Sequence, residues 1–333
     1  MIDVYSALRP ILFALPPEAA HHVAMSLLRA APPWIARRIA GSIITKPISL
    51  FGLDFRNRVG LAAGFDKNGV ALPAWEALGF GFAEIGTVTA KAQPGNPKPR
   101  IFRLPEKQAL INRLGFNNDG ADVVARRLER LRKSGQWPAI PIGINIGKSK
   151  STPLSEAVED YRYSFRRLHS HADYIVLNVS SPNTPGLRSL QAGDSLGELL
   201  HAIQNDNAAR KPIMVKIAPD VSFAQLIEII TTCEEGGAAG LIATNTTLDH
   251  SSIAVAQDEE GGLSGSPLRE KSTSLIRDIA AQTKLPIIGC GGIFDQASAQ
   301  EKVEAGAGLL QVYTGFVYRG PALIREIAAI ANP

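Results

Sequence analysis

Short apolar segments rich in β-branched residues recur along most of this chain and alternate with longer segments of helical periodicity. The short segments lack a polar face, which is typical of strands buried on both sides of a parallel sheet. We predict eight such strands, at residues 59–63, 82–88, 140–146, 174–179, 213–217, 240–244, 287–290 and 309–313. We predict the intervening and final helices at residues 71–79, 119–134, 155–169, 195–209, 222–236, 268–283, 295–305 and 321–331.

Eight strand–helix units in succession predict an α/β fold of the closed (β/α)8 class, the TIM barrel. Parallel strands need right-handed helical crossovers, and a sheet of eight such units closes on itself. An open doubly wound sheet is the structural alternative. It seldom runs to eight regular repeats, and no G-x-G-x-x-G follows the first predicted strand.

Residues 1–46 carry a different pattern. Apolar positions recur at helical spacing in residues 4–15 and again in residues 18–31, and a Pro-Pro pair follows each segment. We therefore predict a two-helix N-terminal domain, residues 1–46, followed by the barrel domain, residues 47–333. No acidic side chain occurs between Ala19 and Leu53, so the charged side chains there are all basic. A pair of amphipathic helices with only positive charge suits an anionic membrane surface. Taken alone, the residues favour packing of this pair on the barrel over membrane contact.

Composition narrows the functional classes. The 333 residues are 45% apolar and 20% charged with a net charge of only +4, so we expect no nucleic-acid partner. The two cysteines, Cys233 and Cys290, support neither a zinc site nor a disulfide framework. No run of eighteen apolar residues predicts a membrane span, and we expect no secretion signal.

The candidate site is the C-terminal end of the barrel, where active sites of this fold lie. The residues that follow the predicted strands are polar or glycine almost throughout, which indicates a ligand even though each alone could simply end a strand. The loop after residues 174–179 carries Ser181, Asn183 and Thr184 together with Pro182 and Pro185. The glycines at 291–292 and the segment 313–315 predict a phosphate site at the last two strands.

A family resemblance rests on motifs spread over nearly the whole chain. They are LAAGFDKNG (61–69), GTVT (86–89), NPKPRIFRLPEKQALINRLGFNN (96–118), GINIGK (143–148), NVSSPNTPGLR (178–188), VKIAPD (215–220), TNTT (244–247), GGLSG (261–265), GCGGI (289–293) and QVYTG (311–315). In this order they resemble dihydroorotate dehydrogenase. Ser181, in place of the cysteine of the soluble classes, and the N-terminal helices resemble the quinone-dependent, membrane-associated class 2.

The resemblance implies oxidation of (S)-dihydroorotate to orotate in de novo pyrimidine (UMP) biosynthesis. Hydride passes to one FMN per chain, and the electrons pass on to ubiquinone or menaquinone. The resemblance also implies a monomer, peripheral on the cytoplasmic side of the inner cell membrane through residues 1–46. Given this resemblance, we predict that these residues contact the membrane, because the helical pair offers a quinone an apolar route from the bilayer.

The resemblance also assigns roles to individual residues. Ser181 is the implied base, and we expect Thr184 to relay its proton through water, because a free hydroxyl is a weak base. Substrate binding is implied for Lys67, Asn112, Arg113, Leu114, Gly115, Phe116, Asn178, Asn183, Asn245 and Thr246. FMN binding is implied for Ala63, Gly64, Phe65, Asp66, Lys67, Thr87, Asn145, Asn178, Lys216, Thr244, Gly265, Gly292, Tyr313 and Thr314. The quinone is expected at His21, Arg103 and Tyr313, with His22 as the alternative histidine.

Three other functions compete with this one. The same reaction with fumarate or NAD as a soluble acceptor is disfavoured by the serine base and by residues 1–46. A flavin-free phosphate-binding barrel isomerase accounts for the glycine pair but not for four asparagines beside Lys216. A non-catalytic barrel that docks on membranes is the third, and flavin colour in the purified protein would exclude the last two.

Overall fold

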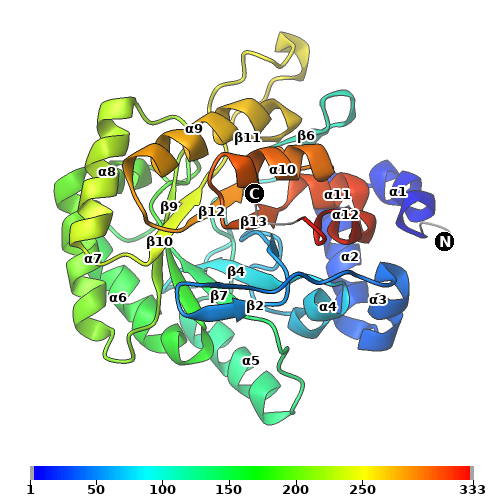
Figure 1. The fold of residues 1–333 in the computed structure, drawn as a ribbon, viewed down its shortest axis with the longest axis horizontal. Helices are drawn as coiled ribbons and strands as arrows, with labels where there is room; N and C mark the ends of the chain where they lie inside the picture. The colour runs from blue at the N-terminus through cyan, green and yellow to red at the C-terminus, as the bar shows by residue number, and fades with distance from the viewer. Residues whose placement is uncertain (1–3, 331–333) are drawn as a thin grey trace.

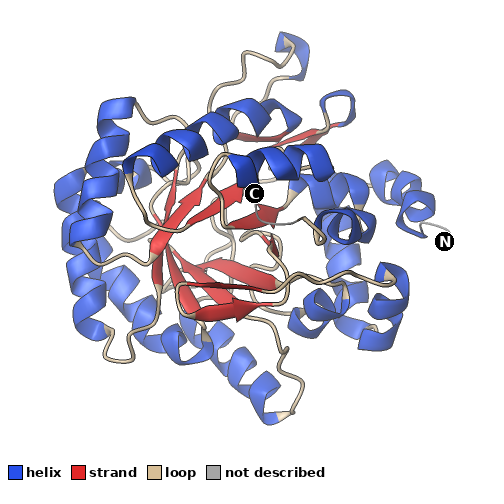
Figure 2. Cartoon of the chain, viewed as in Figure 1, coloured by secondary structure: helices blue, strands red, loops and turns tan. Residues whose placement is uncertain are grey.

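The computed structural model describes residues 4–330, and its centre is a closed barrel of eight parallel strands with helices outside it (Figures 1 and 2). Around the barrel the strands follow the order β10-β12-β13-β3-β4-β7-β8-β9. Their bounds are β3 Val59–Leu61, β4 Phe82–Val88, β7 Ile142–Ile146, β8 Tyr174–Asn178, β9 Ile213–Ile217, β10 Gly240–Ala243, β12 Ile287–Cys290 and β13 Leu309–Val312. The predicted (β/α)8 barrel is therefore confirmed.

Large rings fill the N-terminal end of the barrel interior. Phe82 and Tyr174 are fully buried there, and glycines on neighbouring strands make room for them. A Cβ on Gly60 would lie 2.2 Å from the Phe82 ring, and one on Gly143 would lie 2.1 Å from the Tyr174 ring. The antiparallel pair β1 (Ile48–Leu50) and β2 (Leu53–Phe55) adds Phe55 to the same cluster. The barrel is thus plugged at this end, which leaves its C-terminal end for a ligand.

The helices that surround the barrel follow the predicted order. They are α4 Leu72–Ala77, α5 Ala121–Lys133, α6 Ala157–Leu168, α7 Gly193–Asp206, α8 Phe223–Glu235, α9 Arg269–Gln282, α10 Gln296–Glu304 and α12 Pro321–Ile327. A short helix that the sequence pattern did not predict, α11 (Thr314–Arg319), begins directly after β13. The predicted last helix runs to residue 331, which lies outside the described residues.

Three N-terminal helices, not the predicted two, lie together at one side of the barrel: α1 Val4–Ala14, α2 Pro17–Ala30 and α3 Pro33–Ala40 (Figure 1). The second Pro-Pro pair both ends α2 and begins α3. Pro33 occupies the first position of α3, where the missing N–H of proline costs no helical hydrogen bond. Within residues 4–330, every helix is too short or too polar to cross a membrane.

Two of the long connections fold into a second sheet over the C-terminal end of the barrel. It consists of β5 (Ile101–Leu104), β6 (Ala109–Asn112) and β11 (Gly262–Gly265), all antiparallel. Asn112 pairs with Ile101 on one side and with Gly262 on the other. Segments 150 residues apart in the chain therefore form one wall above the barrel mouth.

Candidate active site

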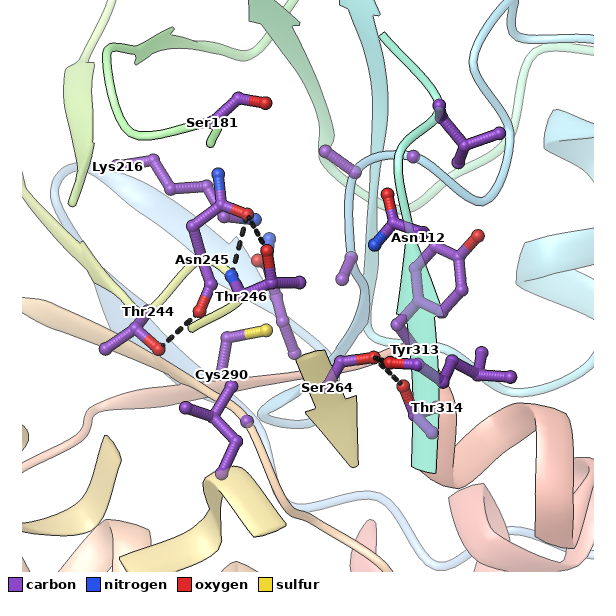
Figure 3. Close-up of a pocket in the computed structure, with 18 of the residues that line it drawn as sticks. Asn112, Ser181, Lys216, Thr244, Asn245, Thr246, Ser264, Cys290, Tyr313 and Thr314 are labelled. Atoms are coloured by element: carbon purple, nitrogen blue, oxygen red, sulfur yellow. Dashed lines mark hydrogen bonds between the residues drawn. The ribbon is translucent and has the colours of Figure 1, made fainter. Parts of the chain in front are cut away.

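A polar cavity of about 140 Å³ lies between the strand ends and this second sheet (Figure 3). Figure 3 shows Ser181, Lys216 and Asn245 on one side of the space, with Asn112 and Tyr313 across from them. Of the residues implicated from the sequence, those that line the cavity are Ala63, Gly64, Lys67, Thr87, Asn112, Leu114, Gly115, Phe116, Asn178, Ser181, Asn183, Lys216, Thr244, Asn245, Thr246, Gly265, Gly292, Tyr313 and Thr314.

Five residues expected to act in catalysis, substrate binding or FMN binding are not among those that line this cavity. The Arg113 guanidinium turns away to Glu259, 3.0 Å distant, and stacks on a neighbouring ring. Asp66 is buried and accepts hydrogen bonds from the Val70 and Ala71 amides, so its carboxylate holds the turn before α4. The remaining three are Phe65, Asn145 and Thr184.

These remaining three lie close behind the cavity wall. Phe65 packs edge-on against His21 and Tyr313, with ring centroids 5.1 and 5.2 Å apart. Asn145 supports Thr87 from behind, and Thr184 is buried in the loop that carries Ser181. A contribution from these residues to ligand binding would therefore act through their neighbours.

Hydrogen bonds fix the amide side chains of the cavity. Asn183 Nδ2 donates to Asn112 Oδ1 at 3.2 Å, and so joins the Ser181 loop to the second sheet. Asn245 Nδ2 donates to Ser180 Oγ at 3.0 Å, while the Thr246 amide donates to Asn245 Oδ1 at 2.8 Å. Because these side chains are already oriented, the cavity presents a preformed set of donors and acceptors.

A buried hydrogen-bond chain lies beneath the cavity, and two of its members, Glu84 and Gln311, were not predicted from the sequence. Asn178 Nδ2 donates to Thr87 Oγ1, which donates to Asn145 Oδ1, at 2.9 and 2.6 Å. Asn145 Nδ2 then donates to Glu84 at 2.9 Å, and Gln311 Nε2 donates to the other oxygen of that carboxylate at 2.5 Å. Glu84 is fully buried in β4. A single acidic residue within an apolar strand indicates a buried polar contact, and this feature of the sequence could have predicted the role of Glu84.

Two lysines bring positive charge to the cavity. Lys67 Nζ donates to the Gly64 carbonyl at 2.8 Å, and burial together with the nearby Arg100 charge lowers the pKa of Lys67 to about 8. Lys216, the last residue but one of β9, pairs with Asn178 of β8 and is buried. Ser181 is buried too, and its Oγ accepts the Asn183 amide at 3.2 Å. An anionic ligand with polar ring groups fits this distribution.

Glycine backbone forms the cavity wall at its far end. Gly265 and Gly292 have φ values of +102° and +70°, which favour glycine. A Cβ on Gly292 would lie 2.3 Å from Arg269 Cα, and one on Gly265 would lie 2.2 Å from the Gln108 carbonyl oxygen. Ser264 and Thr314, whose hydroxyls are 2.8 Å apart, lie beside them. Close backbone and small hydroxyls suit a phosphate.

A second, apolar cavity of about 400 Å³ lies between α1, α2 and the barrel. His21, Arg103 and Tyr313, the residues expected at a quinone, all line it, whereas His22 does not. Burial, with the charges of Lys67 and His22, lowers the pKa of His21 to about 3. Arg103 Nη1 donates to the Phe13 carbonyl at 3.0 Å, but its buried Nε finds no acceptor within residues 4–330.

The two cavities share a wall. Ile101, Leu110 and Tyr313 line both of them, so a ligand in the polar cavity is separated from one in the apolar cavity by few side chains. The aliphatic lining of the second cavity comes largely from the N-terminal helices, including Leu8, Ile11 and Leu27. The molecule therefore places a polar site and an apolar site side by side.

Comparison with known proteins agrees with this arrangement. Residues 47–330 match the family model described as dihydroorotate dehydrogenase. A protein of Gloeobacter violaceus named dihydroorotate dehydrogenase (quinone) is 52% identical over 98% of this chain and 94% of its own length. One of the same name from Marinobacter nauticus is 49% identical over 97% of each chain. The crystal structure of DHODH from Eimeria tenella in complex with ferulenol has a TM-score of 0.86, with 38% identity over 98% of this chain and 93% of that chain. The chain therefore belongs to the dihydroorotate dehydrogenase family.

Proposed function

We propose that this protein oxidises (S)-dihydroorotate to orotate in the polar cavity and delivers the electrons to a quinone in the apolar cavity. The observation that carries the proposal is the pair of adjoining cavities, one polar and one apolar, with Tyr313 in their common wall. A soluble acceptor such as fumarate or NAD would need no apolar cavity. The apolar cavity therefore favours the quinone-dependent reaction.

FMN is the cofactor that we assign to the polar cavity. When bound, FMN accepts a hydride from an organic substrate and passes electrons to a quinone. The residues fit it: Ala63, Gly64, Thr87 and Thr244 would border the ring, and Gly265, Gly292 and Thr314 would hold the phosphate. Lys216 would place a fixed positive charge at the ring, where reduction adds negative charge.

We assign the substrate to the side of the cavity that carries the amides. Asn112, Asn178, Asn183 and Asn245 can each donate and accept, which matches the N–H and C=O groups of a dihydropyrimidine ring. Lys67 and the amides of Gly115 and Phe116 would bind the substrate carboxylate, and Thr246 would complete this wall. The preformed links between these amides support a fixed ring orientation.

Ser181 is our candidate for the base that removes the C5 proton while the C6 hydride leaves. Its hydroxyl lines the cavity and is held next to Asn183. A serine hydroxyl must pass its own proton on as it takes one up. We assign that relay to the buried Thr184 acting through water, since it lies three residues further along the same loop.

We assign ubiquinone or menaquinone to the apolar cavity, with its carbonyl oxygens near His21, Arg103 and Tyr313. The unpaired Nε of Arg103 supports an acceptor there. Apolar side chains of α1 to α3 that are 47 to 66% exposed, among them Leu8, Ile11, Leu27 and Trp34, would rest on a membrane. We propose a monomer, peripheral on the cytoplasmic side of the inner membrane through residues 1–46.

Anaerobic stopped-flow absorbance tests the proposed function. Dihydroorotate should bleach the flavin of the purified protein, and a ubiquinone analogue should restore the colour where fumarate and NAD do not. Ser181→Ala should keep the flavin and slow bleaching by several orders of magnitude, because the proton would have no acceptor. Ser189→Ala, an exposed serine in the same loop, is the matched control. Bleaching of Ser181→Ala at the wild-type rate would show that Ser181 is not the base.

A further inference from the structure

A third cavity, which we call the side cavity, lies between α2 and the barrel beside both cavities described above. Its volume is about 140 Å³, and its polar lining includes Glu18, His22, Asn68 and Asn117. It shares Lys67 with the polar cavity. It also shares His21 and Phe65 with the apolar cavity, and so reaches the end of the apolar cavity where we place the quinone head.

The side cavity is built to hold water. Asn117 Oδ1 is buried and has no hydrogen-bond partner among residues 4–330. Because buried carbonyl oxygens pair with protein or with ordered water, this atom indicates a water molecule in the cavity that it lines. The volume is large enough for several such molecules. His22 is exposed, so the cavity also has a solvent-facing residue in its wall.

The proposed reaction needs a proton at the quinone, and this argument rests on the proposed function. Dihydroorotate loses one hydride, which carries both electrons, and one proton. A quinone becomes a quinol by gaining two electrons and two protons. A hydride supplies both electrons and one of these protons, so the quinone needs one further proton. The substrate proton leaves at Ser181, which lines the polar cavity but neither the side cavity nor the apolar one. The missing proton must therefore come from solvent.

We propose that the side cavity is the water-filled path by which solvent protons reach His21 and, through it, the quinone. The apolar cavity itself is a poor route, since aliphatic side chains form most of its wall and bulk water would be excluded. His21 lines both spaces. One ring nitrogen of its imidazole can release a proton to a quinone oxygen while the other takes one from water, so the ring stays neutral overall. The Phe65 backbone hydrogen-bonds this ring, so water must replace it at the nitrogen that takes up the proton.

The charges around His21 suit a neutral relay. Lys67 and His22 oppose a positive charge on the imidazole, while Glu18 favours one, and burial is the largest effect. The carboxylate of Glu18 is itself engaged by Arg100 at 2.7 Å and by Lys98 at 3.5 Å. With its carboxylate neutralised in this way, Glu18 does not compete for the protons that the water chain carries.

Two variants that each block the side cavity at a different point test this path. Asn117→Leu would replace the unpaired oxygen inside it with methyl groups, and His22→Phe would close its solvent-facing side. We expect both to slow reoxidation of the reduced protein by a ubiquinone analogue at least tenfold, with proton uptake, followed by a pH-indicator dye, slowed in parallel. Dihydroorotate should bleach the flavin at the wild-type rate. His22→Gln, which keeps a polar side chain, is the control, and added imidazole should restore part of the lost rate.

The outcomes separate the path from the function on which it rests. If both apolar variants reoxidise and take up the proton at the wild-type rate, the side cavity is not the route. A high-resolution crystal structure with a dry side cavity would overturn the proposal without any activity measurement. If instead the wild-type protein is not bleached by dihydroorotate, or is not reoxidised by a quinone, the proposed function itself fails.

Discussion

Asp66 offers a prediction whose magnitude follows from three hydrogen bonds. Its carboxylate is 1% exposed and accepts from the Val70 amide at 2.8 Å, the Ala71 amide at 2.9 Å and Trp75 Nε1 at 3.0 Å. Asp66→Ala would leave all three donors without their acceptor. At about 1 to 2 kcal/mol for each, the free energy of unfolding should fall by about 3 to 6 kcal/mol.

This loss converts into a shift of the melting temperature. An unfolding entropy of about 2.1 cal mol⁻¹ K⁻¹ per residue gives about 0.7 kcal mol⁻¹ K⁻¹ for 333 residues. Asp66→Ala should therefore melt about 4 to 9 °C below the wild type in differential scanning calorimetry. Asp66→Asn is the matched control. It keeps one oxygen but turns an NH2 group toward an amide donor, so it should cost about 1 to 3 kcal/mol, or about 1 to 4 °C.

Flavin absorbance and the melting temperature together decide between two roles for Asp66. If the side chain held FMN directly, Asp66→Asn would lose flavin absorbance while the melting temperature of the cofactor-free protein stayed unchanged. A melting temperature of Asp66→Ala within about 2 °C of the wild type would refute the reasoning from buried donors.

Two further predictions concern the N-terminal helices. Ala24 lines the apolar cavity, and Ala24→Trp would place an indole in it. The KM for a long-tailed quinone should then rise at least tenfold, whereas the rate of bleaching by dihydroorotate should not change. An unaltered KM would exclude this cavity as the quinone site. Because the pKa of His21 falls from 6.5 unfolded to about 3 when folded, protonation favours the unfolded chain, and the stability present above pH 6.5 is lost as the pH falls toward 3. The wild type should lose up to about 1.4 kcal/mol per pH unit more than His21→Gln over that range in urea unfolding, and parallel pH profiles would contradict a buried neutral imidazole.

Much of the barrel could be read from the sequence because its information is local. A buried parallel strand is apolar on both faces, and apolar positions in the following helix recur every 3.6 residues. Each strand–helix unit can therefore be recognised from its own segment of sequence. The strand ends follow from the strands, and the fold places them at one mouth. For that reason Lys67, Lys216, Asn178 and Asn245 could be predicted to meet before any contact was known.

Other features depended on the orientation of single side chains. Asp66 and Arg113 lie in the right segments, but the carboxylate of Asp66 turns to the amides before α4 and the guanidinium of Arg113 turns to Glu259. Glu84 supports the cavity from inside the barrel, where the sequence shows only one acid in an apolar run. In each case the strand pattern places the backbone but does not specify the partner to which the side chain turns.

The sequence by itself determined the eight repeats, the position of the site at their C-terminal ends and, through its motifs, the family. Only the tertiary structure decided that α3 is a separate helix, that His21 rather than His22 faces the apolar cavity, and that β6 pairs with β11. The physical reason is the range of the interactions. Backbone periodicity is set by neighbours a few residues apart, whereas the pairing of Asn112 with Gly262 and the sharing of Tyr313 by two cavities are set by contacts that exist only once the chain has closed.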